Sequence, residues 1–355
     1  MGEEKVVILG LSPHRVEFLP LLTPLLKGKD LIILEEPPHP AWKSYLQGDL
    51  GPEELAEALE AGFPTYSSKM ARILKGFWLG GAKICQVEPY LEGLLEIQTL
   101  LEEGLSPEKI ATLDQRFGII YQMEHQTTAT LLDFYASLGA TFDTMVARVK
   151  AFAQADAQRI RLRDQLRAEA IFQIIKASAP KSIFVEAGYI HGRLSYFMAK
   201  KIKTLGYRLI CKNLLIEATQ KLIRRWPQLP RAFLPAPGDG LTASYLFKRG
   251  QQQRDLLAAR SLIYIKLITK EELLPSPEIP FPHLLDELYW KLFVSRLDYH
   301  HCRRIMEKIR LLGTEEARQR ALKIASDLGI KINDLPPLFD NYHQGPGIIQ
   351  ARPLS

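Results

Sequence analysis

Four short runs with apolar centres, separated by segments of helical periodicity, mark out the first half of the chain. They span residues 5–10, 30–35, 83–88 and 182–188, and each ends at or within two residues of a glycine or a proline. Unbroken apolar runs of this length are typical of parallel strands that are buried on both faces. The pattern therefore predicts an α/β fold with a mostly parallel sheet at its core.

A helical pattern over residues 15–26 joins the first two runs, which makes a βαβ unit with a right-handed crossover. A much longer helical stretch, residues 90–180, separates the third run from the fourth. Within it Ser106 and Pro107 form a good helix start, and residues 144–177 have the spacing of one long amphipathic helix. We expect a helical insertion between strands three and four.

The pattern beyond the fourth run is less regular. Residues 207–211 are typical of a further strand, and the prolines and glycines of residues 226–240 predict a loop. The apolar run at residues 261–268 fits either a strand or a buried helix, because periodicity alone does not separate the two.

Four prolines between residues 275 and 282 indicate a linker, and residues 283–328 have a charged, helical pattern followed by an irregular tail. We therefore expect an α/β core over residues 1–270 that includes the insertion, and a helical extension with a tail over residues 271–355.

The composition, with 46% hydrophobic and 24% charged residues, is that of an ordinary globular protein. No run approaches the roughly 18 apolar residues of a membrane helix, and the N-terminus lacks a signal-peptide layout. The three cysteines are widely spaced and suggest neither a disulfide framework nor a zinc pattern. We expect a cytoplasmic protein without a membrane partner.

The formal net charge of +6 raises the question of nucleic acid as a partner. The densest basic stretch comprises Lys200, Lys201, Lys203, Arg208, Lys212, Lys221, Arg224 and Arg225. Such a run is typical of the solvated faces of surface helices, and no RNP-like motif, recognition helix or zinc finger accompanies it. A small-molecule substrate or ligand is therefore the favoured partner, and nucleic acid is not.

Titratable residues follow the predicted strands. His14 and His191 come shortly after the first and fourth strands, and Glu35 and Glu88 end the second and third. Because ligands of open α/β sheets bind beyond the carboxyl ends of the strands, these side chains are candidates for one shared site. Glu186 lies inside an apolar strand, where a buried carboxylate needs a partner.

Two kinds of water activation fit this set. His14 could act as a general base oriented by a carboxylate, or His14, Glu35 and His191 could bind a divalent metal such as Mn, Zn or Co. Glu36 is an alternative to Glu35, since a slip of one residue reverses the direction of a strand side chain. The structural alternative is that these histidines and glutamates only cap loops and helices.

Arg163 lies near the middle of the predicted long helix. It could reach the site as a clamp for an anion or oxyanion. The alternative is a solvated helix face on which Asp164 pairs with Arg161 or Arg167, each three residues away.

Five segments share their order and approximate spacing with the motifs of one superfamily. They are Gly10-Leu-Ser-Pro-His14 with Glu17-Phe18, Leu31-Ile-Ile-Leu-Glu35, Phe63-Pro-Thr-Tyr66, Arg163-Asp-Gln-Leu-Arg-Ala168 and Gly188-Tyr-Ile-His191. This series resembles the erythromycin esterase family and the wider superfamily that includes ChaN-like and TraB/TIKI-like proteins. The resemblance covers residues 5–200.

The resemblance implies a hydrolase with an active-site cleft at the sheet edge. His14 would match the catalytic base, Glu35 the supporting carboxylate, Arg163 the arginine that contacts substrate, and His191 the second histidine. The ChaN-like branch implies the alternative, a protein that binds haem, a metal or another small ligand without catalysis.

The chain also departs from the family pattern. Leu11 stands where the first glutamate of the esterase motif is expected, Arg167 replaces a methionine, and the arginine expected after His14 has no clear match. The loss of a carboxylate beside the base removes part of the machinery that activates water, so the resemblance does not extend to the hydrolysis of macrolide esters.

Overall fold

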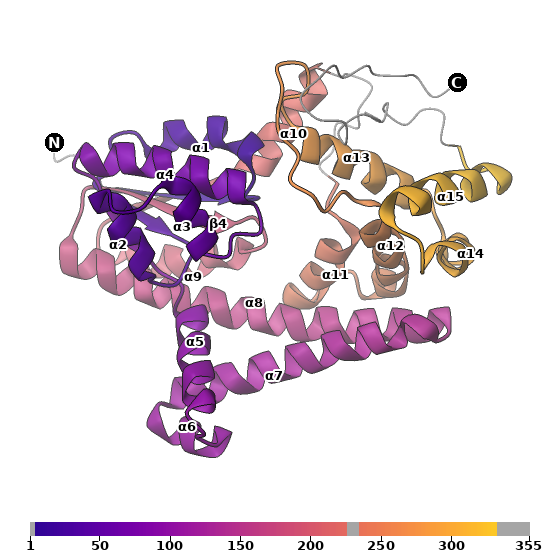
Figure 1. The fold of residues 1–355 in the computed structure, drawn as a ribbon, viewed down its shortest axis with the longest axis horizontal. Helices are drawn as coiled ribbons and strands as arrows, with labels where there is room; N and C mark the ends of the chain where they lie inside the picture. The colour runs from indigo at the N-terminus through magenta and orange to yellow at the C-terminus, as the bar shows by residue number, and fades with distance from the viewer. Residues whose placement is uncertain (1–3, 226–233, 332–355) are drawn as a thin grey trace. The chain divides into compact units, whose positions relative to one another are not determined.

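The computed structural model describes residues 4–225 and 234–331 (Figure 1). In this part of the chain a five-stranded sheet has the order β3-β2-β4-β1-β5, and every neighbouring pair is parallel. The strands are β1 (Val6–Ser12), β2 (Leu31–Leu34), β3 (Lys83–Gln86), β4 (Ser182–Gly188) and β5 (Arg208–Asn213). The predicted α/β fold with a parallel sheet is confirmed.

Helices cover both faces of this sheet. On one face, apolar strand residues such as Leu9 and Val185 pack against α8 (Phe142–Ser178) and α9 (Gly192–Lys203). The other face carries the alternate residues, among them the fully buried Phe184, and lies beneath α1 (Leu19–Leu26) and α4 (Pro64–Leu79) (Figure 1). The central strands are buried on both sides, which explains why their sequences are apolar without alternation.

The helical insertion lies between β3 and β4, as predicted. It comprises α5 (Pro89–Glu102), α6 (Pro107–Leu113), α7 (Gln115–Ala136) and α8, with a short 3₁₀ turn at Ser137–Gly139. The side chain of Ser106 caps α6 by accepting the N–H of Lys109 at 3.4 Å. The smaller helices α2 (Pro40–Gln47) and α3 (Pro52–Ala58) follow β2.

The C-terminal region is helical, with α10 (Leu214–Arg225), α11 (Pro237–Leu246), α12 (Arg254–Leu267), α13 (Pro282–Ser295), α14 (Tyr299–Ile309) and α15 (Thr314–Asp327). Residues 261–268 lie almost wholly in α12, so the ambiguous run is a helix. The predicted loop at residues 226–240 is too long, because Pro237 begins α11, where its fixed φ suits a first helical turn. The rest of that loop at residues 226–233, and the tail at residues 332–355, lie outside the described residues.

The chain divides into two compact units. One comprises residues 1–125 and 159–218 and contains the sheet; the other comprises residues 126–158 and 219–355. The division falls inside α7, α8 and α10, so the expected boundary near residue 271 does not coincide with it. The second unit has its own core, in which Trp290 and Phe293 are fully buried. No described helix is both long and apolar enough to cross a membrane.

Candidate functional site

Polar side chains at the carboxyl ends of the strands form two groups, because successive residues of a strand point to opposite faces of the sheet. Glu186 lies on the same face of β4 as Phe184, toward α4, whereas the neighbouring Ala187 faces α8 and α9. The same alternation sends Glu36 toward the α4 side and Glu35 toward α8. One group lines a cavity, and the other forms a buried ion-pair network.

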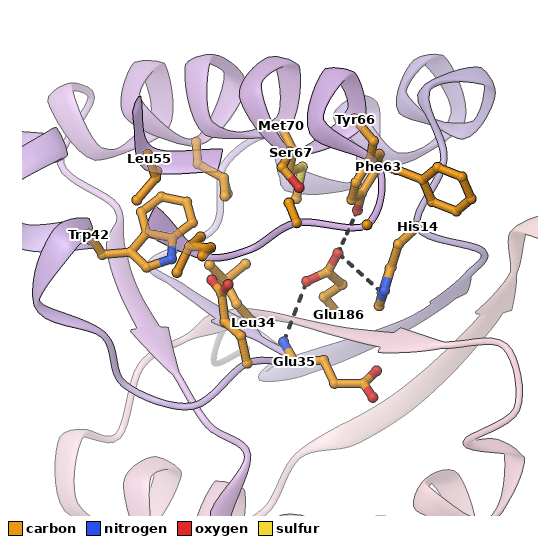
Figure 2. Close-up of a pocket in the computed structure, with 15 residues that line it drawn as sticks. His14, Leu34, Glu35, Trp42, Leu55, Phe63, Tyr66, Ser67, Met70 and Glu186 are labelled. Atoms are coloured by element: carbon orange, nitrogen blue, oxygen red, sulfur yellow. Dashed lines mark hydrogen bonds and ion pairs between the residues drawn. The ribbon is translucent and has the colours of Figure 1, made fainter. Parts of the chain in front are cut away.

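The cavity has a volume of about 250 Å³ and lies between the ends of β1, β2 and β4 and the helices α2 to α4 (Figure 2). Much of its wall is apolar and comes from Leu34, Trp42, Leu55, Leu59, Phe63, Met70 and Leu74. Its polar residues are His14, Glu35, Glu36, Tyr66, Ser67 and Glu186, of which Glu35 binds Glu186 through its backbone N–H while its carboxylate faces Arg163 and His191. An apolar pocket with a few converging polar groups is the usual form of a small-molecule site.

Glu186 is the centre of the polar groups (Figure 2). Its Oε1 accepts the hydroxyl proton of Tyr66 at 2.8 Å, and its Oε2 accepts the backbone N–H of Glu35 at 3.4 Å. These bonds supply the partners that a carboxylate inside an apolar strand requires. Burial and the charge of Glu186 raise the pKa of Tyr66 well above its usual value, so the phenol stays protonated and remains a donor.

His14 faces this carboxylate. Its Nε2 lies 3.6 Å from Oε1 of Glu186, and its ring stacks on Tyr66 with 5.8 Å between centroids and 19° between planes. The Nε2 atom is buried and has no hydrogen-bond partner among the described residues. A ring nitrogen without a partner beside a carboxylate is able to hold a water molecule or a polar substrate group.

Glu36 has a protonation state unlike that of an ordinary glutamate. Burial, followed by repulsion from Glu186, raises the pKa of Glu36 to about 8, although an interaction with the side chain of Gln86 opposes the rise. The cavity therefore holds a carboxyl group that keeps its proton at neutral pH. Two carboxyl groups driven to different states by their surroundings are a common basis for acid–base chemistry.

The second group centres on His191, whose side chain is 2% exposed. Its Nδ1 lies 2.5 Å from Oδ1 of Asp164, and its Nε2 lies 2.8 Å from Oε1 of Glu35. Burial by itself lowers the pKa of His191, but the carboxylates of Glu35 and Asp164 outweigh this effect and raise it to about 9. The imidazolium therefore donates both of its ring protons within the network.

Two arginines of α8 complete the network. Arg163 contacts Glu88 through Nε at 3.3 Å and Glu35 through Nη2 at 3.5 Å. Arg167 donates from Nε to the carbonyl of Val87 at 2.8 Å and from Nη2 to the carbonyl of Glu186 at 2.6 Å. Arg167 thus ties the ends of β3 and β4 to α8.

Glu35 connects the network to the cavity. Burial acts to raise its pKa, but the charge of His191, its hydrogen bond and the charge of Arg167 hold the pKa of Glu35 well below its usual value. Its carboxylate also accepts the backbone N–H of Gly188, while its own backbone N–H binds Glu186. The charged carboxylate of Glu35 therefore fixes the strand end that carries Glu186.

The structure brings the sequence-predicted residues to one edge of the sheet. A Cβ atom placed on Gly188 would lie 3.5 Å from the ring of His191 and 4.0 Å from the ring of His14, so both histidine rings approach this glycine. Glu36 and Glu186 join His14 in the cavity, and Glu35 and Glu88 join His191 in the network. Arg163 and His191 are not among the described residues that line the cavity.

The alternative of a solvated face for this part of α8 is wrong. Asp164 binds His191 and not Arg161 or Arg167, because its side chain is fully buried beneath the strand ends. Arg163, whose side chain is 16% exposed, does not lie on a solvated face. The anchoring roles of Arg167 and Tyr66 were missed by the sequence reasoning, although both stand in the motif segments, where Arg167 departs from the family pattern.

The geometry does not fit the expected metal site. Among residues 4–225 and 234–331, no cluster of three or more His, Cys, Asp or Glu side chains is arranged to hold a metal ion. Both ring nitrogens of His191 carry protons and face carboxylates, and Glu35 is held by Arg163 and Arg167. Metal ligands must offer free electron pairs, so His14, Glu35 and His191 do not form a binding set for Mn, Zn or Co.

Comparison with known proteins found a similar protein in an archaeon. The chain is 29% identical over 293 residues to an uncharacterized protein of Archaeoglobus fulgidus, and the match covers 82% of this chain and 94% of that protein. No family model and no solved structure matches the chain. The similarity to the archaeal protein is longer than residues 5–200, so it extends into the C-terminal helices.

Proposed function

We propose that the chain is a hydrolase that cleaves a small ester or related acyl substrate in the cavity at the sheet edge. The observation that carries this proposal is the convergence of His14, Glu186 and a protonated Glu36 on one apolar pocket. A base, a carboxylate to stabilise it, and a proton donor are the groups that such a reaction requires.

In the proposed reaction, Nε2 of His14 removes a proton from a water molecule, and the hydroxide oxygen attacks the substrate carbonyl. The carboxylate of Glu186 lies 3.6 Å from Nε2 and stabilises the imidazolium that forms. Glu36 donates its proton to the leaving oxygen when the acyl bond breaks. The acid product then carries the hydroxyl group of the water, and the alcohol product carries the proton from Glu36. His14 returns the proton that it took from water to Glu36 through solvent.

Glu35, Arg163 and His191 have positioning roles in this proposal. Their side chains neutralise one another beneath the strand ends and hold Gly188 and Glu186 in place. The resemblance to the erythromycin esterase family supports hydrolysis, since His14 stands at the position of the family's base. Leu11, at the position of the family's first glutamate, is buried in the core, and Glu186 supplies a carboxylate beside His14 instead.

The size of the cavity limits the substrate. A volume of about 250 Å³ is slightly below the roughly 300–1,000 Å³ of pockets for drug-sized ligands. The apolar residues of α3 and α4 favour a short hydrocarbon chain or a single ring next to the scissile bond.

The test is hydrolysis of a panel of short-chain p-nitrophenyl and thioester substrates by the purified chain and its variants. His14→Ala should lower kcat/KM by about 100-fold or more, because the general base is removed. Glu36→Gln should also lower kcat, since an amide cannot donate the proton. The matched control is His300→Ala, which removes an exposed histidine of α14.

A cooperative thermal transition at or above the melting temperature of the parent would show that the variants fold. A His14→Ala variant that is folded and fully active would eliminate the proposed mechanism. No turnover by the parent chain on any substrate of the panel would favour the second candidate, a protein that binds a small ligand in the same cavity without catalysis. The observation in favour of that candidate is Leu11, which places an apolar side chain where the family pattern has a glutamate.

A further inference from the structure

One face of α9 is not used by the site described above. The buried face of this helix consists of Leu194, Met198 and Ile202, which pack on the sheet. Outside this buried stripe the helix carries Tyr196 and Lys200, which are exposed, and Arg193, Phe197 and Lys201, which are partly buried. Basic and aromatic side chains thus alternate along about two turns of a surface helix.

Together with α8 this face forms a hollow of about 500 Å³, lined by Phe172, Tyr196, Phe197, Lys200, Lys201 and Thr204. Tyr196 is 71% exposed, although a tyrosine ring gains stability by burial. The guanidinium of Arg193 lies 6.0 Å from the ring of Tyr196 and 5.9 Å from that of Phe197, and Nζ of Lys201 lies 5.6 Å from the ring of Phe172. The rings therefore lie within a positive electrostatic environment.

The charge around the hollow is mostly positive. Lys200 and Lys203 are exposed on α9, and Lys176 is exposed on α8 one turn after Phe172. Glu169 forms an ion pair with Lys201 and reduces the local charge by one. The sequence alone predicts a solvated helix face for Lys200, Lys201 and Lys203. The structure adds that Phe172, Tyr196 and Phe197 line the same hollow.

We propose that this groove binds single-stranded nucleic acid, with a base stacked on Tyr196 and phosphates held by Lys200 and Lys203. Exposed aromatic rings supply stacking that tolerates any base, and flanking lysines follow the phosphate backbone. An acidic peptide would use the lysines but would leave the exposed ring without a stacking partner. The hollow of about 500 Å³ is small compared with an oligonucleotide, so longer strands would extend along α9 toward its basic C-terminal turn.

The test is fluorescence anisotropy with a labelled oligothymidylate of roughly 15 nucleotides, a length within the site sizes of known single-strand binders. Tyr196→Ala should weaken binding about tenfold, which lies within the range measured for the loss of one stacked base. The double substitution Lys200→Glu with Lys203→Glu should weaken it further and reduce the dependence of affinity on salt concentration. The controls are Tyr135→Ala on α7 and Lys323→Glu on α15, both at exposed positions.

Three results would overturn this proposal. They are absence of binding at low salt, binding that Tyr196→Ala does not change, and tighter binding of a polyglutamate peptide than of the oligonucleotide. Equal loss of binding in the control variants would show a diffuse charge effect and would also reject the groove. None of these results depends on the proposed hydrolase, because the substitutions lie outside the cavity.

Discussion

At the scale of single residues, Glu35 and Glu36 show how position decides chemistry. They are consecutive in the sequence, but the alternation of the strand end directs one into an ion-pair network and the other into the cavity. Positive partners keep Glu35 ionised, whereas burial next to Glu186 keeps Glu36 protonated near neutral pH.

Glu36→Gln should change stability in a pH-dependent way. The folded chain keeps the Glu36 proton up to about pH 8, whereas an unfolded glutamate loses it near its ordinary pKa of 4.5. The free energy of unfolding of the parent therefore falls as pH rises between these values, and glutamine removes this fall. We expect parent and variant to be similar near pH 5 and the variant to be more stable at pH 8.5, as measured by urea denaturation.

Glu57→Gln, at an exposed position of α3, is the matched control and should show no such divergence. If the stability difference for Glu36→Gln does not grow with pH, the raised pKa of Glu36 is wrong. Greater stability at alkaline pH combined with loss of turnover is the pattern expected when a group is retained for function at a cost in stability.

At the scale of secondary structure, close packing between β1 and β4 leaves no room for a side chain at Gly10. A Cβ atom there would lie 2.6 Å from Cζ of Phe184, whose ring is fully buried. In the register of the two strands Gly10 pairs with Glu186, whose carboxylate lies in the cavity. Gly10 also lies against the ring of Phe184.

Gly10→Ala should destabilise the chain by about 1–3 kcal/mol, the usual cost of overpacking a core. Gly76→Ala is the opposite case, because Gly76 lies exposed inside α4 and its added Cβ would meet nothing within 4 Å. It should stabilise by about 0.5–1 kcal/mol, since glycine is a poor helix former. Denaturation midpoints of the two variants on opposite sides of the parent would support the packing; two similar midpoints would contradict it.

Arg167 connects three elements, because its guanidinium binds carbonyl groups at the ends of β3 and β4 from a position on α8. Arg167→Met installs the residue type of the family motif and removes a buried cation from the network. We expect a loss of about 3–5 kcal/mol, because Glu35 and Glu88 then keep their charges with fewer partners.

Arg161→Met is the control, since Arg161 is exposed on the same helix, and its effect should stay within about 0.5 kcal/mol. Equal denaturation midpoints for Arg167→Met and Arg161→Met would show that the network contributes little to stability. A folded Arg167→Met variant should also lose turnover, because the backbone of Glu186 is no longer fixed.

At the scale of the whole molecule, the raised pKa values of His191 and Glu36 make stability fall as pH rises. The pKa of His191 is about 9 in the folded chain and 6.5 in an unfolded one, so its stabilisation is complete below pH 6.5 and is lost as pH rises toward 9. Glu36 adds to this loss. The lowered pKa of Glu35 acts at acidic pH, because the stability that the charged Glu35 contributes is lost as pH falls below 4.5.

We therefore expect the full-length chain to be most stable between about pH 4.5 and 6.5 and to lose stability steadily up to pH 9. Urea denaturation at intervals of one pH unit measures this profile directly. A free energy of unfolding that stays level or rises between pH 6.5 and 9 would contradict the charged state of His191.

The fold and part of the site follow from local patterns in the sequence. Apolar runs bounded by glycine and proline defined the strands, and the rule that parallel strands end at one edge brought together His14, Glu35, Glu88, Glu186 and His191. The ambiguous run at residues 261–268 was not decidable in this way, because a buried helix and a buried strand are equally apolar. The extent of the loop before α11 was also missed, since a proline at a helix start resembles a loop proline.

The sequence by itself determined which residues reach the edge of the sheet, because the number of residues in each strand fixes where the strand ends. Only the tertiary structure decided which face each side chain takes and which partners it meets. Glu36, Tyr66 and Glu186 face one cavity, while Glu35 and His191 are locked into ion pairs. The physical reason is that protonation and pairing depend on burial and on neighbours from α4 and α8, which lie far away along the chain.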